Sequence, residues 1–145
     1  MSNTELSIPD LNVWLALATQ EHIHHAPAKR WWRQHDGPIA FARLSQLGLL
    51  RLMTTAAAMD GKPLTIAEAW RVHDRFYDDD RVTFVAEPAE VEKEFRKRAP
   101  GREASPKVWG DAWMLALATA AGGILVTFDK ALGPRGAHCL LTHKG

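Results

Sequence analysis

Three aspartates that lie far apart in the chain could do chemistry together: Asp10, Asp111 and Asp129. Asp10 directly follows the short apolar stretch at residues 6–9, and Asp129 closely follows the β-branched run at residues 124–126. Both are therefore predicted at the carboxyl ends of strands, where open α/β sheets place their ligand sites. Asp111 is expected on the inward face of the helix that leads into the second of these strands.

A divalent cation is the partner that such a cluster favours. Two like charges about 4 Å apart repel by about 4 kcal/mol at an effective dielectric constant near 20, so three carboxylates at one sheet edge are better tolerated around a hard ion. Oxygen ligands alone select magnesium or manganese over zinc. Such an ion suits phosphate chemistry, and the predicted reaction is hydrolysis of RNA or DNA.

Three neutral side chains are expected beside the aspartates. Asn12 lies near the start of a helix, where its amide could orient Asp10 or bind the backbone. Ser45 and Gln46 fall on the first turn of another helix, just past the end of a strand. A glutamine can bind a water or a phosphate but does not add the charge that a glutamate gives to a metal site.

The stretch at residues 105–130 organises the predicted fold. Ser105 can cap a helix and Pro106 suits a first turn, while the pair Gly122-Gly123 is typical of a helix end. Between Asp111 and Asp129 there is no charged residue, a span at the lower edge of the roughly 17 to 25 residues of a transmembrane helix. Because the glycine pair divides the span, we predict a helix followed by a buried strand and no membrane segment.

The remaining pattern alternates strands with helices, which is typical of a doubly wound α/β domain. We predict a central, mostly parallel sheet of four or five short strands flanked by helices, and one domain over residues 1–145. The helix at residues 43–53 is expected to bury its leucine face, including Leu44 and Leu47. The other predicted helices lie at residues 11–19, 22–35, 65–77 and 88–98, and the other strands at 39–42, 82–85 and 137–142.

The composition argues against a general polyanion-binding surface. The 145 residues carry 18 lysines and arginines against 17 acids, for a net charge of +1. The one dense basic run could guide a phosphate backbone or form a solvated loop; it comprises Arg96, Lys97, Arg98, Arg102 and Lys107.

A single cysteine, Cys139, fits a reducing compartment, and the first ten residues do not resemble a signal peptide. We therefore expect a cytoplasmic protein.

Two other clusters are weaker candidates for metal binding. His22, His24 and His25 have a spacing that does not converge on a tetrahedral zinc ion, so a solvated helix start is expected. Three consecutive aspartates at residues 78–80 cannot all face one ion, and they are expected to form a turn. Trp31 and Trp32 could stack on bases, but we predict that they pack in the protein.

Four segments taken together resemble PIN-domain ribonucleases of the VapC toxin type: IPDLN at 8–12, FARLSQ at 41–46, WGDAW at 109–113 and VTFD at 126–129. The resemblance implies a magnesium- or manganese-dependent endoribonuclease that arrests translation, usually as a homodimer, and a VapB-like antitoxin that masks its site. Asp10, Asp111 and Asp129 match acidic positions of the family, and Asn12 and Ser45 match polar ones. Gln46 stands where many members carry glutamate.

Two other functions remain open on the sequence. Because Gln46 is neutral, the chain could be a PIN-like module that binds RNA or a protein without cutting. A phosphoryl-receiver domain also gathers carboxylates at strand ends, but it needs a lysine at the end of a later strand. Lys130 follows Asp129 too closely to fill that role well.

Overall fold

A computed structural model describes residues 5–141 and contains one five-stranded parallel sheet. The strands lie in the order β3-β2-β1-β4-β5, with each neighbouring pair parallel. Strand bounds are Ser7–Pro9 for β1, Ile39–Phe41 for β2, Val82–Phe84 for β3, Ile124–Thr127 for β4 and His138–Cys139 for β5. The predicted doubly wound α/β fold is confirmed.

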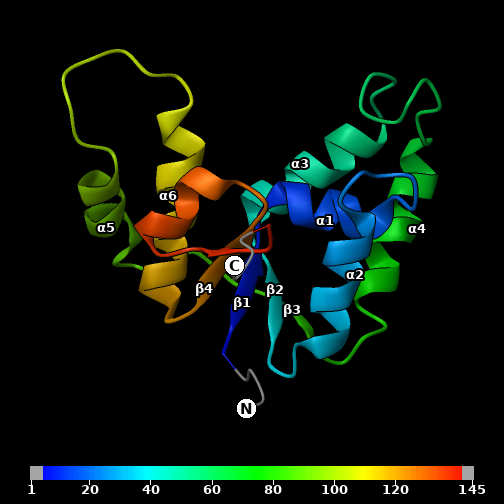
Figure 1. Cartoon of the computed structure of the whole chain (residues 1–145), viewed down its shortest axis with the longest axis horizontal. Coiled ribbons are helices and arrows are strands. Elements are labelled where there is room, and N and C mark those ends of the chain that lie inside the picture. The colour runs from blue at the N-terminus through cyan, green and yellow to red at the C-terminus, as the bar shows by residue number, and fades with distance from the viewer. Residues whose placement is uncertain (1–4, 142–145) are drawn as a thin grey trace.

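Helices cover both faces of this sheet (Figure 1). In that view α5 and α6 lie to the left of the strands, and α1 to α4 lie to the right. Helix bounds are Leu11–Ala18 for α1, His25–Gln34 for α2, Arg43–Met53 for α3, Ile66–Phe76 for α4, Val91–Arg98 for α5 and Val108–Ala121 for α6; the short 3-10 helix η1 is Lys130–Arg135.

Alternation along the strands divides the buried apolar residues into two cores. Ile8, Ala40 and Leu125 face α5 and α6, where they join Met114 and Leu117 in one cluster. The opposite faces of the same strands turn toward α1 to α4, and there Ile39, Phe41 and Val126 pack with Trp14 and Leu49. The sheet edge at the carboxyl ends of β1 and β4 therefore lies between two packed layers.

Three helices begin two or three residues later than predicted, and all for the same reason. A single turn precedes each helix: His25 N–H donates to the His22 carbonyl, Val91 N–H to Pro88, and Val108 N–H to Ser105, at 2.9, 3.1 and 3.3 Å. Ser105 thus accepts through its carbonyl oxygen, and its hydroxyl does not cap α6, whose N-cap residue is Lys107. The predictions found each local signal but placed the helix one turn too early.

The predicted apolar face of α3 is wrong at Leu44 and Leu47, although Met53 at its end is buried as expected. Leu44 and Leu47 are 45% and 56% exposed, while Ser45, Gln46, Gly48 and Leu49 are buried. A Cβ atom on Gly48 would come within 2.7 Å of Leu11 Cδ2, so α3 lies close against α1 along its glycine face. That close approach between two helices decides which side of α3 is buried, and it is not visible in the spacing of the leucines.

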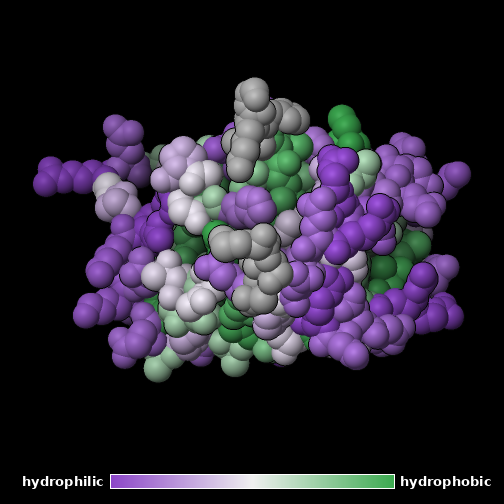
Figure 2. Space-filling view, turned by 60° about the horizontal axis from the view of Figure 1, so that its bottom comes forward, coloured by the Kyte–Doolittle hydropathy of each residue, from purple (hydrophilic) through white to green (hydrophobic). Residues whose placement is uncertain are grey.

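The uncharged stretch before Asp129 is a helix and a strand, as predicted. Helix α6 ends at Ala121, and Gly122 takes a left-handed conformation with φ +71° that favours glycine. Within residues 5–141 no helix has the length and hydropathy needed to cross a membrane. On the face shown in Figure 2, hydrophilic residues line the left and right margins and hydrophobic residues gather nearer the middle.

The last strand is shorter than predicted. Strand β5 consists of His138–Cys139, whereas residues 137–142 were expected to be extended. Leu140 N–H still donates to the Thr127 carbonyl at 2.9 Å before the chain turns. The final predicted residue, Thr142, lies outside the described residues.

Candidate functional site

Asp10 stands at the carboxyl end of β1 and also caps α1. Its Oδ1 atom accepts a hydrogen bond from Leu11 N–H at 2.8 Å, and its Oδ2 atom accepts one from the Thr127 hydroxyl at 3.1 Å. The backbone N–H of Asp10 donates to the Val126 carbonyl at 2.7 Å, which ties the strand end to β4. The carboxylate is therefore held in place by the first residue of α1 and by the last residue of β4.

Thr127 links Asp10 to Asp129. Its buried hydroxyl accepts a hydrogen bond from Asp129 N–H at 3.0 Å while it donates to Asp10. Asp129 in turn caps η1, because its Oδ1 atom accepts from Ala131 N–H at 2.9 Å. Sequence reasoning missed Thr127, although its position two residues before Asp129 puts both on the same side of an extended segment.

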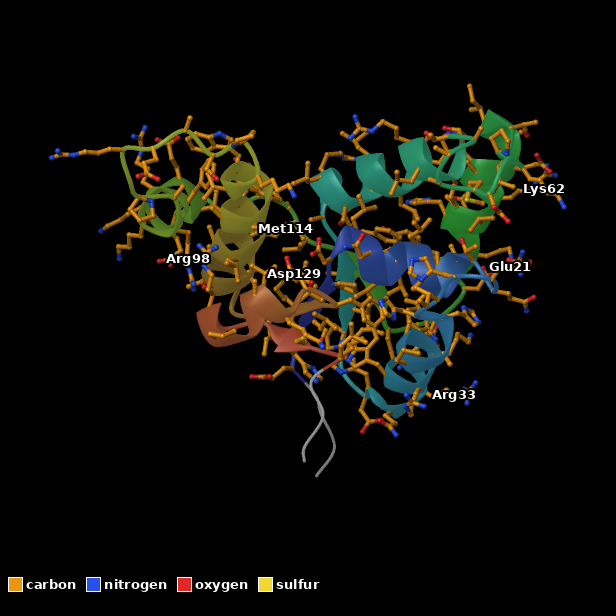
Figure 3. The ribbon with its side chains drawn as sticks, turned by 45° about the horizontal axis from the view of Figure 1, so that its top comes forward. Glu21, Arg33, Lys62, Arg98, Met114 and Asp129 are labelled. Carbon is orange, nitrogen blue, oxygen red and sulfur yellow. The ribbon has the colours of Figure 1, made fainter. Side chains whose placement is uncertain are left out.

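Asp111 approaches the same edge from the first turn of α6. The charge of Asp129 acts on Asp111, and Arg135 and Lys107 lie near enough to offset part of that repulsion. Figure 3 places Asp129 centrally, between α6 on one side and α1 on the other. Asp10 lies about a hundred residues before Asp111 and Asp129 in the chain, yet the charges of both act on its carboxylate.

The carboxylates carry negative charge that their surroundings do not fully balance. Burial raises the pKa of Asp10 above its ordinary 3.8, and the charges of Asp111 and Asp129 raise it further, against hydrogen bonds from Leu11 and Thr127. Burial and the Asp129 charge likewise raise the pKa of Asp111. Excess negative charge carried by oxygen atoms alone is the chemistry that a hard divalent cation fits.

The carboxylates do not form a finished metal cage. Within residues 5–141, no three histidine, cysteine, aspartate or glutamate side chains surround one point closely enough to hold an ion as they stand. Binding would therefore require Asp10, Asp111 and Asp129 to turn inward or to share the ion with water and substrate oxygens. Magnesium commonly binds in this way, through one or two carboxylates, several waters and phosphate oxygens.

The raised pKa of Asp10 predicts a gain in stability when its charge is removed. Because the folded protein binds this proton more tightly than the unfolded chain does, stability falls as pH rises from about 4 through the folded pKa. Without divalent ions at pH 7, Asp10→Asn should raise the free energy of unfolding by about 1.4 kcal/mol for each unit of pKa elevation. The variant should therefore unfold at a higher temperature than wild type. Asparagine can still cap α1.

Thermal unfolding followed by circular dichroism between pH 3 and pH 8 tests this expectation. The difference between Asp10→Asn and wild type should close as the pH is lowered through the folded pKa. Asp80→Asn, an exposed residue in the turn before β3, is the matched control and should not change the profile. A lower unfolding temperature for Asp10→Asn at pH 7 would contradict the expectation that the Asp10 charge destabilises the folded protein.

Gln46 is hydrogen-bonded within α3 and to α4. Its buried side chain accepts a hydrogen bond from Arg43 Nη1, and its Nε2 atom lies 3.1 Å from His73 Nε2. His73 Nδ1 lies 2.8 Å from Asp74 Oδ1, an arrangement in which the amide donates to the ring and the ring donates to the carboxylate. Gln46 thus joins α3 to α4, a contact that its place after a strand did not indicate.

The other two polar candidates lie on first turns. The Ser45 hydroxyl donates to the Ala42 carbonyl at 3.0 Å and accepts from Ala42 N–H at 3.1 Å, so it closes the start of α3. Asn12 is exposed on α1, two residues after Asp10. The roles of Asn12, Ser45 and Gln46 in a site stay predictions.

The basic run divides into two groups. Arg98 is held by Glu94 at 3.2 Å, by the Arg135 carbonyl at 2.8 Å and by Thr119 Oγ1 at 3.1 Å, and Arg135 Nη2 donates back to the Arg98 carbonyl at 2.8 Å. Figure 3 shows Arg98 on the α6 side of the molecule. Arg96 pairs with Glu92 at 3.0 Å on the surface of α5. The exposed members are Arg96, Lys97, Arg102 and Lys107.

The histidine and tryptophan candidates have structural partners. His25 Nδ1 lies 2.7 Å from the Ala16 carbonyl, His24 stacks on Phe128, and His22 Nδ1 accepts from His24 N–H at 3.0 Å. Trp31 is buried, and Trp32 packs edge-on against Trp14 with ring centroids 6.2 Å apart. The two tryptophans pack inside the protein, as predicted.

Comparison with known proteins agrees with this architecture. The family model described as the PIN domain matches residues 8–133. The chain is 41% identical to Ribonuclease VapC41 of Mycobacterium tuberculosis over 128 residues, which are 84% of this chain and 88% of that protein.

Two solved structures share the fold at low sequence identity. One is the crystal structure of Mycobacterium tuberculosis VapC20, described as a Sarcin-Ricin loop cleaving toxin (TM-score 0.62, 17% identity, 90% of this chain and 95% of that chain). The other is VapBC-1 from nontypeable Haemophilus influenzae (TM-score 0.65, 14% identity, 94% and 99%). With a family model that spans most of its length and a relative sharing two residues in five, this protein belongs to the PIN domain family and groups there with the VapC-type ribonuclease toxins.

Proposed function

We propose that this protein is a divalent-metal-dependent endoribonuclease, the toxin of a toxin-antitoxin pair. The observation that carries the proposal is the electrostatic coupling of Asp10, Asp111 and Asp129 at one edge of the sheet. The relatives named as VapC ribonucleases support the choice of RNA as substrate. Mg²⁺ or Mn²⁺ is the cofactor that an all-oxygen donor set selects.

In this proposal some residues of the chain would hold the cation, and others would bind the RNA substrate. When bound, a divalent cation supplies positive charge that orients a phosphodiester and makes a water molecule easier to deprotonate. Asp10, Asp111 and Asp129 would hold that cation, with Asp10 fixed by its bonds to Leu11 and Thr127. Lys107 and Arg135, which already act on Asp111, would attract the phosphates on either side.

The polar residues have accessory roles in this proposal. Asn12, exposed two residues after Asp10, would donate to a phosphate or a water. Ser45 and Gln46 would act indirectly, because their hydrogen bonds hold the start of α3 and join it to α4. Among the exposed cations of the basic run, Lys97, Arg102 and Lys107 would guide the RNA backbone, while Arg96 is paired with Glu92 and Arg98 is committed to structural bonds.

The partners follow from the same proposal. A VapB-like antitoxin would mask the site, in line with the VapBC-1 structure that shares the fold. Exposed apolar side chains on α3 and α4, among them Leu47 and Trp70, support association with a second copy. Light scattering that reports a monomer at micromolar concentration would contradict the homodimer.

The place of action would be the cytoplasm, where RNA and a reduced Cys139 are both expected.

A second candidate is a PIN-like module that binds RNA or a protein without efficient cleavage. It is favoured by Gln46, which supplies no charge and is occupied by Arg43 and His73. Under this alternative the three carboxylates would bind an ion too weakly to support turnover.

Incubation of the purified protein, freed of any antitoxin, with total RNA separates the two candidates. Discrete cleavage products are expected with Mg²⁺ or Mn²⁺, none with excess EDTA, and recovery when the ion is restored. Sequencing the new RNA ends would then define the target. Absence of cleavage with every divalent ion, together with a retained gel shift on the same RNA, would favour the binding module.

A further inference from the structure

A pocket between α5 and α6 lies outside the carboxylate site. It has a volume of about 400 Å³ and is lined by Glu92, Phe95, Arg96, Ala99 and Trp109. The volume falls in the range of roughly 300 to 1,000 Å³ that is typical of pockets for small molecules. Its walls combine two aromatic rings with one ion pair, a set that neither the three aspartates nor the fold requires.

Trp109 is the distinctive wall of this pocket. The indole is 59% exposed, although burying a tryptophan side chain is strongly favourable. It meets Phe95 edge-on, with ring centroids 6.2 Å apart and planes at 73°, so Phe95 supports it from one side. A large aromatic ring that is braced on one side and open to solvent on the other is a stacking platform.

The pocket and the carboxylate site lie on opposite sides of the amino end of α6. Trp109 and Asp111 are two residues apart on the first turn, so their side chains leave the helix in nearly opposite directions. A strand of RNA that reaches both must pass around half the circumference of a helix about 10 Å across, on the order of 16 Å. Lys107, the N-cap residue, and the backbone N–H groups of the first turn lie between them and favour a phosphate.

We infer that the pocket formed by Phe95 and Trp109 binds an unpaired base of the RNA substrate, a few nucleotides away from the phosphate that is cut. The inference rests on the proposed nuclease function and names a part of the substrate. RNA of defined sequence is recognised mostly through unstacked bases that lie on aromatic rings and offer their edges to polar groups. Trp109 would stack on the base, and the Glu92–Arg96 pair would meet its edge.

The charges on the pocket wall favour a base over a phosphate. Glu92 Oε2 accepts from both Arg96 Nε and Arg96 Nη2, at 3.1 and 3.0 Å, so the arginine charge is already partly neutralised. The carboxylate repels an incoming phosphate but accepts hydrogen bonds from the N–H groups of a base. The phosphates are expected instead over Lys107, on the rim.

Binding of short RNAs to variants at position 109 tests this inference. The probes are fluorescein-labelled single-stranded 12-nucleotide RNAs, and the assay is fluorescence anisotropy with Asp10→Asn protein to prevent cleavage. Trp109→Ala should weaken binding by about 5- to 150-fold, the effect of losing one stacked base, and Trp109→Phe should recover part of it. Ile23→Ala, which also removes a large exposed apolar side chain, is the matched control and should bind like the parent.

RNAs with one abasic nucleotide sharpen the test. At one position of the RNA, removing the base should weaken binding to the parent protein as much as Trp109→Ala weakens binding to the intact RNA. Removing the same base should not weaken binding to the Trp109→Ala protein any further. In the cleaving protein, Trp109→Ala should raise KM with kcat nearly unchanged. Additive losses at every abasic position would overturn the base-binding pocket.

The remaining outcomes also decide the matter. If the parent cleaves RNA and Trp109→Ala binds and cleaves it equally well, the inference fails and the nuclease proposal stands. If Trp109→Ala changes only inhibition by the antitoxin, the pocket is a protein contact and the inference fails. If the parent neither binds nor cleaves RNA, both proposals fall.

Discussion

Asp10→Asn and Asp129→Asn are each expected to lower the rate of RNA cleavage by at least about 100-fold while the protein stays folded. Each change removes one negative charge from the carboxylate group without removing volume, and metal assistance to phosphate chemistry is worth several kcal/mol, with about 1.4 kcal/mol for each factor of ten. Gel assays under single-turnover conditions, with Mg²⁺ and with Mn²⁺, measure the effect.

Two controls keep this result specific. Asp80→Asn makes the same chemical change at an exposed position before β3, at the opposite end of the strands, and should cleave like wild type. Calorimetric titration with Mg²⁺ should show weaker binding for Asp10→Asn and unchanged binding for Asp80→Asn. Wild-type cleavage by either site variant would remove the carboxylates from the mechanism.

Trp14→Ala is expected to destabilise the fold by about 3 to 5 kcal/mol, the usual range for removing a large aromatic ring from a core. The Trp14 ring is fully buried and stacks on Phe41 with centroids 3.7 Å apart and planes at 6°, and Phe76 meets it edge-on at 5.0 Å. These contacts join α1, β2 and α4 on one face of the sheet. Urea unfolding monitored by circular dichroism gives the change in free energy.

Trp14→Phe separates the loss of the ring from the loss of polar atoms. The indole N–H of Trp14 is buried and has no hydrogen-bond partner among the described residues, so phenylalanine removes a costly group while it keeps an aromatic ring. It should therefore destabilise by much less than alanine. Equal losses for both variants would show that the stacking geometry, rather than the buried area, controls this core.

The elements that carry the site could be predicted because their signals are local. Pro9 and the glycines after α6 mark the ends of segments, and the rule that parallel strands end at one edge brings Asp10 and Asp129 together. What could not be predicted depends on contacts between distant elements. The buried face of α3 is set by the approach of Leu11 to Gly48, and the partner of Gln46 is a histidine 27 residues away on another helix.

Thr127 illustrates the same division. Its strand was predicted from its β-branched neighbours, but its hydrogen bond to Asp10 spans 117 residues of sequence. Only the pairing of β1 with β4, in which Pro9 lies opposite Val126, brings the two side chains together. The sequence therefore indicated which strand ends carry aspartates, but it did not indicate the hydrogen bonds that link them.

The paired bonds between Arg98 and Arg135, in which each guanidinium donates to the other residue's carbonyl, have a mechanical consequence. They fasten the end of α5 to the end of the 3-10 helix that begins directly after Asp129. A ligand that pushes α5 aside must either break both bonds or carry the 3-10 helix with it. A ligand that displaces α5 without breaking these bonds would therefore also move the 3-10 helix, and with it Asp129 at the sheet edge.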